Sequence, residues 1–143
     1  PWVTQAGYWL IHLEESYLIE ITWKPYLLEQ QNSDNNEDWF AWEQDLSTYV
    51  SRGIWAHIGG IAARNISKEA GYEYMKKLLH EKHVARKDVR SKDYIVDLAK
   101  RIDIFSDSFS NDLESHDFFE LRLVIPYQCI APFLSGIQFP SLS

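Results

Sequence analysis

The chain has 143 residues but only one cysteine, Cys129, and one methionine. A lone cysteine excludes an intrachain disulfide, which disfavours a secreted scaffold and favours a reducing, cytoplasmic setting. Long apolar runs are also lacking: residues 123–134, the longest near the C-terminus, are interrupted by prolines and are too short to span a bilayer. The N-terminus, which opens at Pro1, lacks the pattern of a secretory signal. We therefore expect a cytoplasmic protein without a membrane helix.

The sequence also lacks the common motifs of catalytic and metal sites. The chain contains no glycine-rich phosphate loop, no zincin pattern and no calcium loop. His80 and His83 have the spacing of two metal ligands, but a single cysteine and no neighbouring carboxylate motif leave such a site incomplete. We predict no metal, no cofactor and no catalytic residue. A small-molecule enzyme stays open as an alternative, since it would need a deep pocket that sequence cannot reveal.

Aromatic residues, by contrast, make up 15% of the chain, and all six tryptophans lie within its first 55 residues. The length fits a single globular domain, 1–143, with a core large enough to fold alone. Most indoles are expected to fill that core. Six are many to bury completely, so one or two at the surface would anchor a partner, with Trp39 and Trp42 as candidates because they adjoin an acidic loop.

The net charge is −7, but acidic and basic residues are unevenly distributed along the chain. Residues 76–101 carry nine basic and four acidic side chains, whereas the segments before and after them are acidic. We therefore expect a dipolar molecule whose field steers charged partners.

Both ends of the chain predict strands. Residues 8–13 and 17–23 are rich in aromatic and β-branched side chains and flank a short polar segment, which is typical of a hairpin. Residues 118–125 alternate apolar and polar side chains, as a strand does. In residues 54–66, the Gly59-Gly60 pair can form a turn between two further strands, which we favour, or can interrupt a buried helix.

Helical spacing of apolar residues predicts three helices between these strands. The first is capped by Asn35 or Asn36 and ends at Gly53, the second follows Ser67, and the third follows Ser91. Residues 29–38 and 107–115 are polar and predict loops. The predicted fold class is therefore α+β, with an antiparallel or mixed sheet from N- and C-terminal strands and about three helices packed on one face.

The function that these patterns favour is a non-enzymatic protein-binding module with an acidic, aromatic-rich surface for a basic protein partner, as in an inhibitor, an immunity-type protein or an adaptor. Carboxylates would steer the cationic partner and an exposed indole would supply desolvated contact area. The residues predicted for this surface are Glu37, Asp38, Trp39, Trp42, Glu43 and Asp45.

The alternative is a nucleic-acid-binding or phosphodiester-processing domain that uses the basic segment to neutralise phosphates. Its predicted residues are Lys76, Lys77, His80, His83, Arg86, Lys87 and Arg90. A solvated helix face, with its lysines paired to neighbouring acids, explains the same residues without any nucleic acid.

Overall fold

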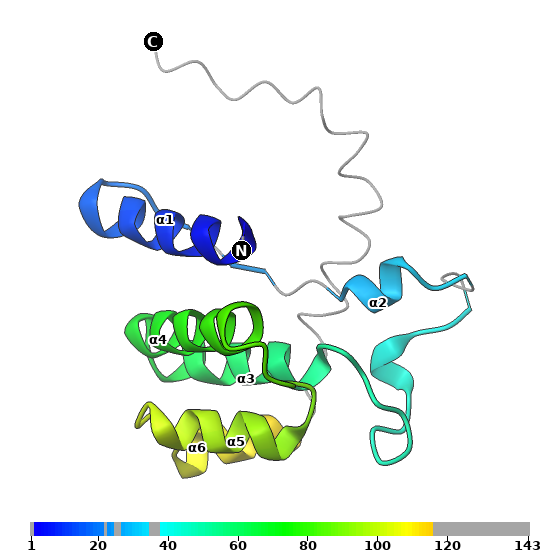
Figure 1. Ribbon diagram of the computed structural model, residues 1–143. Helices are drawn as coiled ribbons and strands as arrows, with labels where there is room; N and C mark the ends of the chain where they lie inside the picture. The colour runs from blue at the N-terminus through cyan, green and yellow to red at the C-terminus, as the bar shows by residue number, and fades with distance from the viewer. Residues whose placement is uncertain (1, 22, 25–26, 35–37, 116–143) are drawn as a thin grey trace.

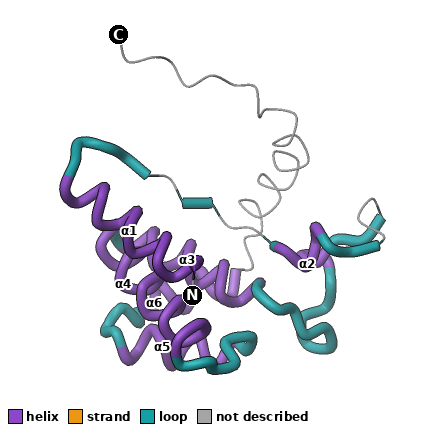
Figure 2. The backbone as a smooth tube through the Cα atoms, turned by 45° about the horizontal axis from the view of Figure 1, so that its top comes forward, coloured by secondary structure: helices purple, strands orange, loops and turns teal. Residues whose placement is uncertain are grey.

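The computed structural model describes residues 2–21, 23–24, 27–34 and 38–115, which form helices and loops and contain no strand (Figure 2). The predicted α+β class is therefore wrong for this part of the chain, and the strand predicted at 118–125 lies outside it. None of the described helices has the length and apolar character needed to cross a bilayer.

Helix α3 (Ile54–Ile66) is the central element of the fold. It packs against α4 (Lys68–Leu79), α5 (Lys92–Arg101) and α6 (Asp107–Ser115). Helix α1 (Trp2–Ser16) contacts α4 and lies on the side of the α3–α4 pair opposite to α5 and α6 (Figure 1). The core lies around α3, and its largest fully buried side chains are Ile54, Tyr74, Ile95, Leu98, Phe109 and Leu113.

The Gly59-Gly60 pair lies inside α3, so the favoured turn between two strands is wrong and the alternative, a buried helix, is correct. Gly59 is required by close packing. A Cβ atom there would lie 2.4 Å from the Tyr74 hydroxyl oxygen and 2.6 Å from Cγ2 of Ile95. The Tyr74 hydroxyl is itself fixed, because it donates a hydrogen bond of 2.8 Å to the Ala56 carbonyl. Side chains from α4 and α5 thus rest directly on the α3 backbone.

Helix α1 replaces the first strand of the hairpin predicted at 8–13 and 17–23, and the described residues from 17 to 24 have no regular structure. Four buried residues of α1, Thr4, Gly7, Ile11 and Glu14, recur every three or four positions, which is the period of a helix facing a core. The aromatic side chains that suggested a strand are mostly on the outer face of this helix.

The helices predicted after Ser67 and Ser91 are confirmed as α4 and α5, together with their caps. The Ser67 hydroxyl accepts a hydrogen bond from the Ala70 amide at 3.0 Å, and the Ser91 hydroxyl accepts one from the Tyr94 amide at 3.1 Å. Residues 107–115, predicted as a loop, instead form helix α6.

The helix predicted to end at Gly53 is wrong. Its place is taken by turns and by η1 (Ala41–Glu43), a single 3-10 turn. The short helix α2 (Leu28–Gln31) precedes it and overlaps the start of the predicted 29–38 loop. The buried Gln30 side chain donates to the Trp39 carbonyl at 2.7 Å and accepts from the Ala41 amide at 2.9 Å. These bonds satisfy backbone groups that a continuous helix would have paired internally. The two candidate caps, residues 35–36, lie outside the described residues.

Candidate functional site

The two indoles of the predicted acidic surface are used in packing. Trp42 is only 7% exposed, and its ring lies against Phe40 with centroids 5.1 Å apart. Trp39 is half-buried and meets the edge of Tyr49 at 5.7 Å. Each ring therefore has an intramolecular partner, and neither is displayed as the free anchor that the sequence suggested.

The carboxylates of this predicted surface are exposed where the structure describes them. Asp38, Glu43 and Asp45 lie at the surface, and Glu37 lies outside the described residues. Asp45 accepts hydrogen bonds from the amide and hydroxyl of Ser47, which lower the pKa of its carboxyl group. Binding of a basic protein at this surface stays a prediction.

The tryptophans that are displayed are Trp2 and Trp9, at 83% and 60% exposure on the outer face of α1. They are seven residues apart, so the two rings lie on the same side of the helix. Sequence reasoning missed this pair because it predicted a strand at 8–13 and no regular element at Trp2, so it did not place the two rings on one helix face.

Several basic side chains of residues 76–101 form ion pairs with neighbouring acidic residues. Among the seven predicted nucleic-acid contacts, Lys76 pairs with Glu73, Lys77 and Lys87 pair with Glu81, and Arg90 pairs with Asp88. His80 and His83 lie in η2 (His80–Val84), a π-helical turn that continues α4, with His83 half-buried and His80 and Arg86 exposed. No group of three metal-binding side chains occurs among the described residues. Nucleic-acid binding by this segment stays a prediction.

Glu81 is the centre of this basic segment and is only 4% exposed. Its carboxylate accepts a hydrogen bond from the Tyr94 hydroxyl and lies 3.2 Å from Nζ of Lys77 and 3.2 Å from Nη1 of Arg101. The Tyr94 bond, followed by those from the two cations, outweighs burial and lowers the pKa of Glu81 to about 2. The cluster ties α4, η2 and α5 together.

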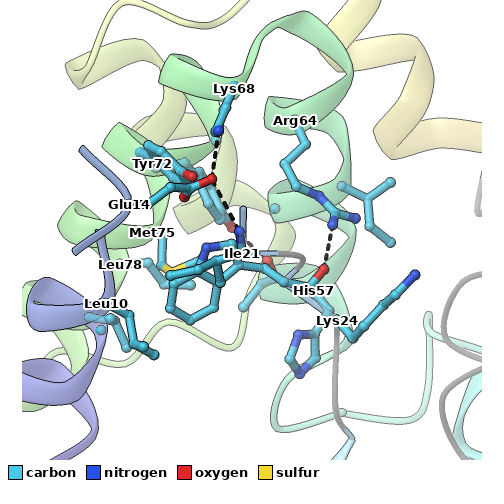
Figure 3. Close-up of a pocket in the computed structure, with 18 of the residues that line it drawn as sticks. Leu10, Glu14, Ile21, Lys24, His57, Arg64, Lys68, Tyr72, Met75 and Leu78 are labelled. Carbon is cyan, nitrogen blue, oxygen red and sulfur yellow. Dashed lines mark hydrogen bonds and ion pairs between the residues drawn. The ribbon is translucent and has the colours of Figure 1, made fainter. Parts of the chain in front are cut away.

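A cavity lies elsewhere in the described chain, between α1, α3, α4 and the segment that follows α1 (Figure 3). Its volume is about 690 Å³, within the range of small-molecule sites. The walls are mainly apolar. They include Ala6 and Leu10 of α1, Ala56 and Ile61 of α3, and Met75 and Leu78 of α4.

Glu14, Lys68 and Tyr72 form one polar part of this cavity wall. One carboxylate oxygen of Glu14 lies 2.6 Å from Nζ of Lys68 and accepts a hydrogen bond from the Ile21 amide at 3.2 Å. The same ammonium lies 5.8 Å from the centre of the Tyr72 ring. The hydrogen bond from Lys68 is the largest influence on Glu14 and holds the pKa of its carboxyl group below the usual value in spite of burial.

A second polar part of the wall lies where α3 meets the segment after α1. Arg64 donates from Nη1 to the Trp23 carbonyl at 2.5 Å, and His57 and the exposed Lys24 also line the cavity. Arg64 and Glu14 therefore each hold the backbone of this segment, Arg64 through a carbonyl and Glu14 through an amide (Figure 3).

Three wall residues contain a polar atom that is shielded from solvent and has no hydrogen-bond partner in the protein. These atoms are Oε2 of Glu14, Nε1 of Trp23 and the hydroxyl of Tyr72. An enclosed polar atom without a partner costs about 1–3 kcal/mol. The cavity thus has mainly apolar walls, and three wall residues carry a polar atom that is covered by protein and has no partner.

No sequence motif signals this cavity, because its walls come from segments far apart in the chain. Comparison of the chain with protein-family models, with curated proteins and with solved structures finds no match.

Proposed function

We propose that this chain is a non-enzymatic binding domain that encloses a small, mainly apolar molecule in the cavity between α1, α3 and α4. The observation that carries the proposal is the cavity itself: about 690 Å³, bounded largely by aliphatic and aromatic side chains, with a few polar groups at its wall. Binding is favoured over catalysis because these polar groups are engaged in holding the fold rather than arranged as a nucleophile and its base.

The expected affinity is modest. A ligand that buries about 300 Å² of apolar surface gains roughly 7 kcal/mol from leaving water, against which the loss of translational and rotational freedom must be set. Dissociation constants in the micromolar range or weaker therefore fit an apolar ligand without polar contacts. Tighter binding requires hydrogen bonds to the wall.

Titration with N-phenyl-1-naphthylamine, an uncharged dye that fluoresces in apolar surroundings, tests this function. We expect a saturable rise in dye fluorescence with the wild-type protein. Leu10 lines the cavity, so the larger indole of Leu10→Trp should occupy part of it and weaken dye binding at least tenfold.

The matched control is Gln5→Trp, which adds the same indole at an exposed position of the same helix and should leave dye binding unchanged. Circular dichroism shows whether both variants keep their helices. Absence of saturable fluorescence in the wild type, or equal binding by two folded variants, would refute the proposal.

A further inference from the structure

We infer that the molecule bound in this cavity carries an uncharged group that both donates and accepts hydrogen bonds, such as a primary amide or a hydroxyl, and that its donor is received by Glu14. The inference rests on the proposed function and adds the chemical class of the ligand. It follows from the unpaired polar atoms of the cavity wall and from the charge of Glu14.

The donor requirement comes from Glu14, whose side chain is only 3% exposed. Lys68 and the Ile21 amide both approach Oε1, which leaves Oε2 without any donor. An ionised carboxylate accepts hydrogen bonds and cannot donate one. The terminal torsion of a glutamate is broad, so a small rotation suffices to turn Oε2 toward a ligand in the cavity.

The acceptor requirement comes from Trp23. Its indole nitrogen can only donate, and no acceptor in the protein reaches it. Trp23 and Glu14 both line the cavity, and Trp23 lies two residues beyond Ile21, whose amide is bound to Glu14. The Tyr72 hydroxyl, which can serve in either role, completes the set.

Charge disfavours a ligand carboxylate beside Glu14. The Lys68 ammonium is already engaged at 2.6 Å by the Glu14 carboxylate. A second anion placed beside the free oxygen of Glu14 would be repelled in a cavity of low polarity. An amide presents N–H to Glu14 and C=O to Trp23 without adding charge.

Competition against bound N-phenyl-1-naphthylamine tests the inference with octanamide, 1-octanol and octanoate, which share one chain length and differ in the polar group. We expect octanamide and 1-octanol to displace the dye at concentrations at least tenfold lower than octanoate, a difference of about 1.4 kcal/mol. In Glu14→Gln, which presents an amide N–H in place of the free oxygen, this preference should fall to less than threefold.

Glu15→Gln is the control, because Glu15 is the adjacent acid and is exposed; it should keep the wild-type preference. Equal displacement by the three compounds in the wild type, or stronger displacement by octanoate, would overturn the inference while dye binding still upheld the proposed function. The second result would point to an anion site on Arg64 or Lys24. If Glu14→Gln does not fold, 1-methoxyheptane decides the matter in the wild type, because it is uncharged and has the size of 1-octanol but cannot donate a hydrogen bond: it should displace the dye less well than 1-octanol, and equal displacement would overturn the inference.

Discussion

Alanine replacements at the two neighbouring glycines of α3 are expected to have opposite effects: Gly60→Ala should stabilise the protein and Gly59→Ala should destabilise it. Alanine in a helix interior is favoured over glycine by about 0.5–1 kcal/mol. At Gly60 the new Cβ would meet Tyr74 ring carbons at 3.6 and 3.9 Å, which is ordinary van der Waals contact. Gly60→Ala should therefore raise the free energy of unfolding by nearly the full helix-propensity gain.

At Gly59 the gain in helix propensity is opposed by a collision. The new Cβ would lie 2.4 Å from the Tyr74 hydroxyl and 2.6 Å from Ile95 Cγ2, so both buried side chains must move by several tenths of an ångström or more. Such overpacking costs about 1–3 kcal/mol, and loss of the hydrogen bond from Tyr74 to the Ala56 carbonyl costs a similar amount. We expect Gly59→Ala to lower stability by about 1–4 kcal/mol.

Urea denaturation followed by circular dichroism measures both variants. At roughly 4 °C per kcal/mol for a domain of this size, thermal melts should separate them by at least about 6 °C. Tyr74→Phe provides a further check, because removal of the hydroxyl oxygen relieves part of the collision and should make Gly59→Ala less costly in that background. Equal stabilisation by the two glycine replacements would refute the packing of α3 against α4 and α5 described above.

Two further predictions concern charged groups. The Glu81 carboxyl group has a pKa lowered from 4.5 to about 2, so its contribution to stability is present above pH 4.5 and is lost as the pH falls toward 2. In Glu81→Gln, the free energy of unfolding should therefore fall less steeply as the pH is lowered from 7 to 2, as measured by urea denaturation. An unchanged pH dependence would show that Glu81 is not the group responsible. If the acidic surface binds a basic protein, reversal of Asp38, Glu43 and Asp45 to lysine should slow association with a copurifying partner and reduce its salt dependence in surface plasmon resonance, whereas identical rates would eliminate that surface.

The helices that the sequence predicted correctly are those in which two local signals agree. Helices α4 and α5 each follow a serine whose hydroxyl caps the first turn, and each has one apolar stripe against the core. Both signals lie within a dozen residues, so no knowledge of the rest of the chain is needed to recognise them.

The segments that were predicted wrongly depend on contacts outside themselves. The glycine pair of α3 resembles a turn until Tyr74 and Ile95 are placed against it. Residues 107–115 contain few apolar side chains, but Phe109 and Leu113 are four apart and fully covered by the core. The cavity could not be anticipated either, because the packing distance between helices is not encoded in any single segment.

The contacts of Glu81 and Glu14 also bear on which helices separate first from the rest of the fold. Glu81 is held by groups from two helices, so separation of α4 from α5 breaks its hydrogen bond with Tyr94 and its ion pair with Arg101. Helix α1 is joined to α4 by the pair of Glu14 with Lys68, whose side chain is 56% exposed, and by the hydrogen bond of 3.2 Å that the Tyr8 hydroxyl donates to the Lys76 carbonyl. We expect detachment of the first helix from the remaining bundle to need less free energy than separation of α4 from α5, and it would widen access to the cavity without global unfolding.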